Sequence, residues 1–258
     1  YDYQIIGRDW MVSQETEKNQ FDDLLFPPGG ILADEVGLGK TIMTLSLILK
    51  NRLPKTLILL PKSLISQWES QIKKLCAIDI DIVMINKDTK ISESDCGIFI
   101  MSQSILNSRG SVPGESPIHK VIWDRVIIDE AHCLRNGKSK FYESCCMIHS
   151  DIKWALTATP IMNRMIDFVN IMLWIGIDKD VCQVHKEYIC DKFVMRRTKE
   201  DVKMSNKELE LPPCKIDIKY IPFQSNYEER LYIDTYTKYR GQLQQTNNYI
   251  YMLENLFR

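Results

Sequence analysis

Short, unbroken runs of Val, Ile and Leu alternate along this chain with amphipathic segments that are long enough to form helices. Apolar runs of this length are typical of strands buried on both faces, and strands that alternate with helices are typical of parallel sheets. The sequence therefore predicts an α/β fold with a mostly parallel sheet flanked by helices. We expect strands at 30–33, 56–60, 81–85, 97–101, 125–129 and 153–157, and helices at about 39–51 and 63–75.

The first expected strand leads into a glycine-containing turn that opens a helix, Asp34-Glu35-Val36-Gly37-Leu38-Gly39-Lys40-Thr41. Backbone N–H groups of such a turn can cradle phosphate oxygens, and ligands of open α/β sheets bind at the carboxyl ends of the strands. We expect Lys40 to reach the β- and γ-phosphates of a nucleotide and the Thr41 hydroxyl to bind magnesium. The turn departs from the strict P-loop pattern G-x-x-x-x-G-K-[ST], because Asp34 holds the first glycine position.

A later strand ends in two carboxylates, in the string Asp129-Glu130-Ala131-His132. Asp129 can hold magnesium through water, and Glu130 can then polarise a water that attacks the γ-phosphate. A strand capped by solvated acids is the ordinary alternative, but the combination with Lys40 favours chemistry. The sequence thus predicts a magnesium-dependent ATP hydrolase with Lys40, Asp129 and Glu130 as its catalytic residues.

Together these strings resemble helicase superfamily two, and specifically its Swi/Snf branch of ATP-dependent DNA translocases. The likeness extends through nearly the whole chain in the family's order, at 3–11, 59–68, 123–125, 134–140, 155–163, 193–202 and 211–213. It implies a first RecA-like lobe that binds ATP and magnesium and acts on double-stranded DNA together with a second lobe. The string Arg135-Asn136 leans toward the branch that contains helicase-like transcription factor.

The resemblance also implies roles for individual residues. Gln4 is expected to read adenine, within a nucleotide-binding set that includes the whole 34–41 turn. Coupling between ATP and DNA is expected at His132, Thr157, Ala158 and Thr159. Contacts with the DNA backbone, without sequence readout, are expected at Lys62, Ser63, Arg135, Asn136, Lys138 and Lys140.

Three positions depart from the family's usual residues. Val36 stands where methionine is usual, Ala158 where glycine is usual and Met162 where glutamine is usual. None of these changes removes a phosphate or metal ligand, but the last two put the details of coupling in doubt.

The charge balance does not by itself point to nucleic acid, because the net charge is −1 with 26% charged residues. Contacts with DNA must therefore come from local patches. Arg196, Arg197 and Lys199 form one basic cluster. Such a cluster is typical of a solvated face, although in the resembled family similar residues often support DNA or lobe contacts.

The eight cysteines include no C-x-x-C pair, and several lie in apolar surroundings, as Cys96 does before Gly97-Ile98-Phe99. This pattern predicts reduced, buried thiols in an intracellular protein. Cys182, His185 and Cys190 lack a fourth ligand at a standard spacing, so packing is favoured over zinc. No apolar run approaches the ~20 residues of a membrane span. The resemblance implies a nuclear location.

The expected organisation is a lobe at residues 1–211 and an inter-lobe linker with a helical extension at 212–258. We expect a piece of a longer protein whose second lobe lies elsewhere, so that this chain alone hydrolyses almost no ATP. A nucleotide-gated module that binds DNA or protein without catalysis is the alternative. The sequence leaves open the pathway (chromatin remodelling, repair or transcription), any chromatin or transcription partners, and the oligomeric state.

Overall fold

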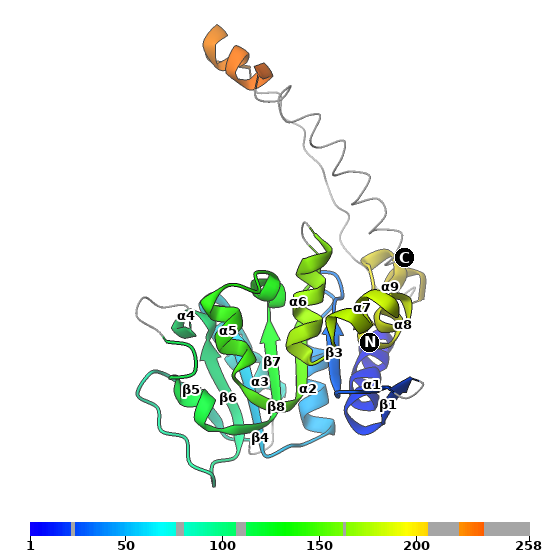
Figure 1. Ribbon diagram of the computed structural model, residues 1–258, viewed down its shortest axis with the longest axis vertical. Helices are drawn as coiled ribbons and strands as arrows, with labels where there is room; N and C mark the ends of the chain where they lie inside the picture. The colour runs from blue at the N-terminus through cyan, green and yellow to red at the C-terminus, as the bar shows by residue number, and fades with distance from the viewer. Residues whose placement is uncertain (22–23, 76–79, 107–111, 162–163, 206–221, 235–258) are drawn as a thin grey trace. The chain divides into compact units, whose positions relative to one another are not determined.

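A sheet of seven strands forms the centre of the computed structural model, in the order β5-β6-β4-β7-β8-β3-β9 (Figure 1). Each neighbouring pair in it is parallel, which confirms the predicted fold class. The strands are β3 (Gly29–Leu32), β4 (Lys55–Leu60), β5 (Ile82–Ile85), β6 (Gly97–Ser102), β7 (Ile122–Asp129), β8 (His149–Leu156) and β9 (Val194–Met195). All but β9 overlap predicted strands.

The structure describes residues 1–21, 24–75, 80–106, 112–161, 164–205 and 222–234. The chain divides into two units, Tyr1–Glu208 and Leu209–Arg258. In the second unit, residues 226–234 are helical. The predicted boundary between residues 211 and 212 lies outside the described residues, as does most of the predicted helical extension.

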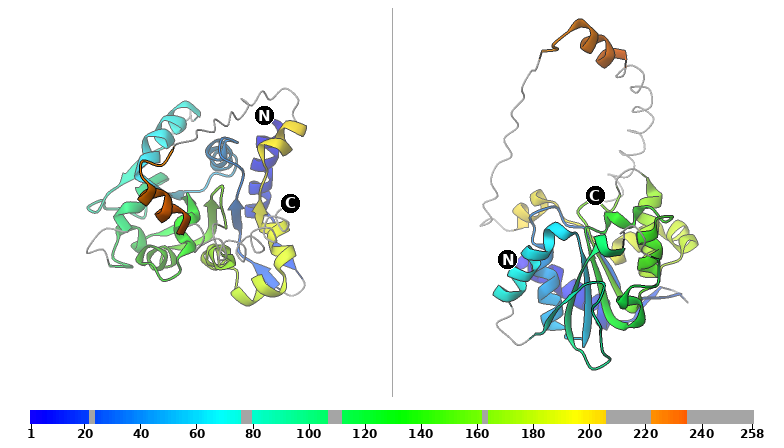
Figure 2. Two further views of the ribbon diagram at one scale, coloured as in Figure 1. Left: turned by 90° about the horizontal axis from the view of Figure 1, so that it is seen from above. Right: turned by 90° about the vertical axis from the view of Figure 1, so that its left-hand side faces the viewer.

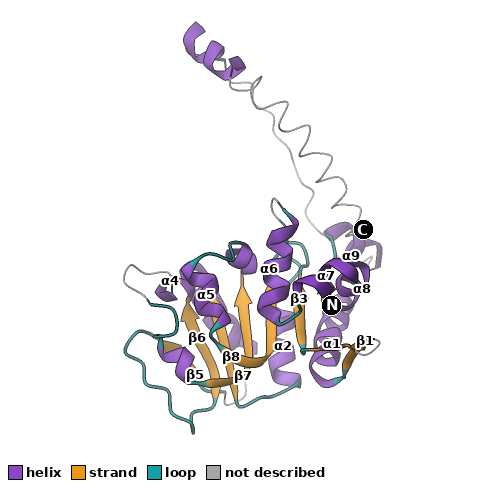
Figure 3. Ribbon diagram, in the orientation of Figure 1, coloured by secondary structure: helices purple, strands orange, loops and turns teal. Residues whose placement is uncertain are grey.

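Helices cover both faces of the sheet (Figure 2). One face carries α1 (Asp2–Thr16), α2 (Lys40–Lys50) and α3 (Ile65–Leu75), and the other carries α5 (Lys140–Cys146) and α6 (Met165–Ile175). Figure 3 distinguishes these helices from the strands. The smaller elements are the hairpin β1 (Asn19–Phe21) and β2 (Leu24–Phe26), the helices α4 (Gln103–Leu106), α7 (Lys179–Val184), α8 (Lys186–Phe193) and α9 (Lys199–Ser205), and the 3₁₀ turns η1 (Lys62–Leu64), η2 (Pro117–Lys120) and η3 (Ala131–Arg135).

Strand β4 shows why the apolar runs of the sequence are unbroken. Ile58 and Leu60 join a buried cluster with Trp68 and Ile72 of α3. Successive side chains of a strand point to opposite faces, so Leu59 between them must pack on the other side, where it is equally buried. A strand covered by helices on both faces therefore needs an apolar residue at every position.

A fully buried ion pair ties α1 to the sheet. Both side chains, Glu15 of α1 and Arg125 of β7, have 0% exposure. The Arg125 Nε donates to Glu15 Oε1 at 2.6 Å, and the guanidinium also donates to the Thr56 hydroxyl and the Asn51 carbonyl. Glu15 accepts further bonds from Trp154 Nε1 at 2.8 Å and Asn51 Nδ2 at 2.7 Å. Because a buried charge is stable only with such partners, this network fixes where α1 lies.

The described cysteines are all free, and Cys145, Cys182 and Cys190 are buried as expected. The expectation of burial is wrong for Cys96 and Cys146, which are both exposed. Cys96 precedes the first residue of β6 and so lies in the loop that enters the strand rather than in its buried part. Among the described residues no group of three or more potential His, Cys, Asp or Glu metal ligands occurs. None of the described helices is long and apolar enough to span a membrane.

We predict that Arg125→Met lowers the free energy of unfolding by about 3–5 kcal/mol, because it leaves the Glu15 carboxylate buried without its partner. The double variant Glu15→Leu/Arg125→Met should recover much of this loss, since neither charge is then buried. Arg8→Met is the control, because Arg8 pairs with Asp9 at the surface and should contribute less than about 1 kcal/mol. Urea denaturation measures all three. A double variant as unstable as Arg125→Met would contradict this account.

Candidate active site

The register of three strands brings the predicted site residues to one edge of the sheet. Leu32 of β3 pairs with Leu156 of β8, and Leu156 pairs with Asp129 of β7. The loops that follow these strands therefore leave the sheet at the same level. Only β8 separates β3 from β7, so their axes are about 10 Å apart at the usual strand spacing. The 34–41 loop and the carboxylates thus lie at the same edge of the sheet, on either side of the end of β8.

The 34–41 loop ends in a glycine that must adopt a left-handed conformation. Gly39 caps α2 with φ of 85°, and a Cβ at this position would collide with the side-chain amide of Gln4. No side chain caps the N-terminus of α2, so its first backbone N–H groups are left to other partners. A helix N-terminus that follows a left-handed glycine and has no side-chain cap is suited to bind an anion such as phosphate.

Gln4 lies in the first turn of α1, against this loop. Its Nε2 donates to the Leu38 carbonyl at 3.2 Å. The structure thus brings Gln4 next to the expected nucleotide loop, although the two are 34 residues apart in the chain. Its role in reading adenine stays a prediction.

Lys40 is partly buried at the start of α2, and its Nζ donates to the main-chain carbonyl of Asp34 at 2.7 Å. Burial lowers the pKa of Lys40, while the charges of Asp129, Asp34 and Glu130 oppose that shift. The ammonium group therefore shares one electrostatic environment with the carboxylates at the end of β7. Its one bond to a neutral carbonyl leaves it able to bind phosphate oxygens.

Asp129 is buried and held by three neighbours. Its carboxylate accepts bonds from Trp68 Nε1 at 2.8 Å and from the Glu130 amide at 2.9 Å, and its carbonyl accepts from Gln103 Nε2 at 2.6 Å. Burial raises the pKa of Asp129, and the bonds from Trp68 and Glu130 oppose the shift. No sequence pattern indicated that Trp68 would hold the Asp129 carboxylate or that Gln103 would hold its main-chain carbonyl. The only signal was that a buried indole needs an acceptor.

Glu130 has the backbone strain that often accompanies function. With φ of 51° it is the only non-glycine residue of positive φ within the described parts of the chain. Its Oε2 lies 3.1 Å from His132 Nδ1, and both side chains are about 40% exposed, at 41% and 39%. The side chain of Glu130 is therefore accessible at the edge of the sheet, beside the buried Asp129.

The expected coupling turn is joined to the end of the strand that precedes the 34–41 loop. The Thr157 amide donates to the Leu32 carbonyl at 3.2 Å. The Thr157 hydroxyl, which is fully buried with its residue, accepts from the Thr159 amide at 3.2 Å across Ala158. A movement at the end of β3 would therefore also displace residues 157–159, through the bond between Thr157 and Leu32.

The residues expected to contact DNA are all exposed and follow the carboxyl ends of β4 and β7. They are Lys62, Ser63, Arg135, Asn136, Lys138 and Lys140. The first two lie in the turn after β4, and the others lie between η3 and the start of α5. They thus belong to the same edge of the sheet as the 34–41 loop.

The oxygen donors Thr41 and Asp129 are suited to magnesium rather than to a metal held by protein alone. Magnesium usually keeps several waters and is bound by one or two carboxylates together with substrate phosphates. Thr41 follows Lys40 at the start of α2 and is half-buried.

Comparison with known protein families matches the SNF2-related domain to residues 3–186. The chain belongs to this family. It is 31% identical over 268 residues to DNA repair protein rad8 of Schizosaccharomyces pombe, with 81% of this chain and 23% of the relative covered. It is 29% identical over 262 residues to DNA repair protein RAD5 of Candida albicans, with 79% and 24% covered. The chain thus spans less than a quarter of the length of these relatives.

Solved structures of the same family resemble this SNF2-related domain in fold. The Sulfolobus solfataricus SWI2/SNF2 ATPase core in complex with dsDNA superposes with a TM-score of 0.62 at 26% identity. The match covers 79% of this chain and 45% of that one. This likeness confirms the predicted Swi/Snf resemblance and the RecA-like sheet.

One basic residue of the first unit, Arg197, does not lie where the sequence suggested. The interpretation of the cluster Arg196, Arg197 and Lys199 as a solvated face is wrong for Arg197, whose side chain is only 17% exposed. It forms an ion pair with Asp34, which is fully buried. The Asp34 carboxylate therefore serves Arg197, while the Asp34 carbonyl serves Lys40. The sequence offered no local signal for this pair, because the two residues are 163 positions apart.

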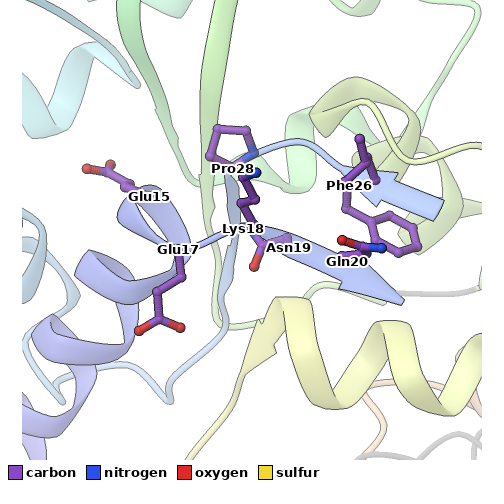
Figure 4. Close-up of a pocket in the computed structure, with 8 residues that line it drawn as sticks. Glu15, Glu17, Lys18, Asn19, Gln20, Phe26 and Pro28 are labelled. Carbon is purple, nitrogen blue, oxygen red and sulfur yellow. The ribbon is translucent and has the colours of Figure 1, made fainter. Parts of the chain in front are cut away.

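A pocket of about 550 Å³ lies elsewhere on the domain (Figure 4). It is lined by Glu15, Glu17, Lys18, Asn19, Gln20, Leu25, Phe26 and Pro28. Pro28 precedes β3, and Glu15 lies in the last turns of α1. The pocket is thus at the amino edge of the sheet, away from the 34–41 loop, and forms no part of the site.

We predict that Trp68→Phe raises the magnesium concentration for half-maximal binding of a nucleotide analogue by about 10- to 100-fold. The substitution keeps the aromatic ring but removes a hydrogen bond to a charged group, worth about 1.5–3 kcal/mol. The lost donor also raises the pKa of Asp129 further, so the deficit should grow as the pH falls and the carboxyl is protonated. Trp123→Phe is the matched control, because its indole donates to the Ile118 carbonyl instead. Equal titrations for both variants would contradict a role for Trp68.

Proposed function

We propose that this SNF2-related domain is the ATP- and magnesium-binding lobe of a double-stranded DNA translocase. The observation that carries the proposal is that Lys40, Asp129 and Glu130 lie together at the carboxyl edge of the sheet, where the two carboxylates act on the Lys40 charge. The uncapped N-terminus of α2 lies at the same edge. A cation, a buried carboxylate and an accessible carboxylate are the groups that phosphoryl transfer to water requires.

Each residue has a separate task in this proposal. The N–H groups of the 34–41 loop and Lys40 bind the phosphates, and Thr41 and Asp129 hold the metal. Magnesium, when bound, neutralises charge that develops on the phosphate oxygens. Glu130 orients a water and accepts its proton, for which its exposed position beside Asp129 is suited. Gln4 at the loop would contact the base.

DNA is proposed to bind at the exposed residues that follow β4 and β7. The Sulfolobus solfataricus relative is described in complex with dsDNA, which supports duplex DNA as the ligand. Lysine and arginine contacts to phosphates give affinity that falls steeply with salt and carry no sequence readout. Similarity to proteins named for DNA repair favours a repair function and a nuclear location for the protein. A second lobe would close over the nucleotide from the other side.

A non-catalytic module that binds nucleotide without hydrolysis is the other candidate. Such a module would not need Glu130, whose accessible carboxylate is present here beside Asp129. We therefore favour hydrolysis, with the rate dependent on the second lobe.

We predict that Lys40→Ala weakens binding of a fluorescent ATP analogue by about 10- to 100-fold. The reason is the loss of a charge-assisted bond to the phosphates, worth about 1.5–3 kcal/mol. Lys50→Ala is the control, because Lys50 is exposed at the far end of the same helix. Fluorescence titration with magnesium present measures both. Unchanged affinity in Lys40→Ala would remove the 34–41 loop from phosphate binding.

We predict that residues 1–258 bind ATP yet release phosphate very slowly with or without duplex DNA. A chain that also carries the second lobe should show DNA-stimulated release, because a cation supplied in trans contributes about 10³–10⁵ in related reactions. In that longer chain Glu130→Gln should keep ATP binding and lose about 10²–10⁴ in rate. Glu143→Gln, at an exposed glutamate of α5, should leave the rate unchanged. Parent-like turnover by Glu130→Gln would exclude Glu130 as the base.

A further inference from the structure

Arg197 makes several contacts with the 34–41 loop that no sequence pattern indicated. Its backbone amide and its Nε donate to Asp34 Oδ1 at 2.9 and 3.1 Å, and its NH2 group donates to Asp34 Oδ2 at 2.5 Å. The Asp34 side chain is fully buried at the position where the strict loop pattern has glycine. A buried carboxylate with three donors from one residue has its direction fixed by that residue.

The guanidinium group of Arg197 is itself held by α1 and α2. Its NH1 group donates to the Tyr3 carbonyl at 2.5 Å. The central carbon of the guanidinium lies 5.5 Å from the centre of the Tyr3 ring. Its NH2 group also lies 3.4 Å from the sulfur of Met43. A Cβ on Gly7 would approach that NH2 group to 2.8 Å, so α1 packs directly on it. Arg197 therefore has little freedom to turn away from Asp34.

The main chain around Arg197 runs beside the loop and is bonded to it at several points. The Ala33 amide donates to the Met195 carbonyl at 2.6 Å, and the Glu35 amide donates to the Arg197 carbonyl at 2.9 Å. Glu35 Oε2 accepts from the Lys199 amide at 2.8 Å, where α9 begins. Residues 33–35 and 195–199 thus form one bonded strip.

We propose that Arg197 is a positioning residue that sets the conformation of the 34–41 loop. Through it, nucleotide binding at the loop also changes the conformation and protection of α9. Phosphates that bind at residues 37–41 displace the loop. Because Asp34 is bonded to Arg197, residues 195–205 move with it. α9 is the last helix of the first unit within the described residues. The signal would therefore reach the part of this unit from which the chain continues into the second unit. The inference rests on the proposed nucleotide binding.

The test needs a variant that folds. Arg197→Met alone leaves Asp34 as an uncompensated buried charge, which lowers stability strongly. Asp34→Gly/Arg197→Met removes both charges and places at residue 34 the glycine that the strict P-loop pattern has there. Arg197→Lys keeps the charge but lacks the planar fork that donates to both carboxylate oxygens. Arg196→Met is the matched control, because Arg196 is exposed and adjacent.

The measurement is hydrogen–deuterium exchange of residues 34–41 and 198–205, with and without a saturating, non-hydrolysable ATP analogue and magnesium. In the parent and in Arg196→Met, nucleotide should slow exchange about tenfold in both segments. In Asp34→Gly/Arg197→Met the analogue should bind about tenfold more weakly. At saturation it should then protect residues 34–41 while leaving residues 198–205 unchanged. Arg197→Lys should restore part of the protection of 198–205. A role in stability alone would lower the melting temperature and leave that protection intact.

Two results would overturn the proposal while the proposed nucleotide binding stands. One is protection of 198–205 in the double variant equal to that in the parent. The other is a parent in which nucleotide protects 34–41 and leaves 198–205 unchanged. If the analogue does not bind to the parent at all, the proposed function and this inference both fail.

Discussion

The register between β3, β8 and β7 is the constraint on which the site depends. Leu32, Leu156 and Asp129 lie side by side, so three loops begin at one level of the same edge of the sheet. If the register of β7 shifted by one residue, its side chains would point to the opposite faces of the sheet. Asp129 would then pack among apolar side chains, at a large cost in desolvation. Because β7 has buried side chains on both faces, packing resists that shift, and the position of the carboxylates follows from the packing of the sheet.

The strands and the two loops that carry the proposed chemistry could be predicted because their signals are local. An apolar run that ends in Asp129-Glu130, and one that ends before Gly39-Lys40-Thr41, each predict a strand with its loop. The contacts that hold these loops could not be predicted. Trp68 binds Asp129 from 61 residues away, and Arg197 binds Asp34 from 163 residues away. A charge pattern alone indicates solvent exposure, so Arg197 was placed on a solvated face.

Burial favours the neutral form of two ionisable groups in the proposed site, Lys40 and Asp129. It lowers the pKa of Lys40 and raises that of Asp129, so both groups are pushed toward their neutral forms. The nearby opposite charges and the Trp68 bond oppose this effect and favour the charged forms. Such a balance suits a site whose ligand brings its own charges, since the phosphates stabilise the ammonium group and a metal stabilises the carboxylate. The same burial strengthens each charge interaction once a ligand excludes water.

Apolar packing and buried polar contacts therefore do different work in this domain. The apolar layers on the two faces hold the strands, but their attraction is non-directional and fixes a loop only loosely. Three polar contacts add direction: Glu15 with Arg125 for α1, Trp68 with Asp129 for the end of β7, and Arg197 with Asp34 for the 34–41 loop. Each joins a segment that carries a proposed site residue to a distant element. Since a buried pair contributes little net stability compared with apolar side chains of similar size, its value here is in position.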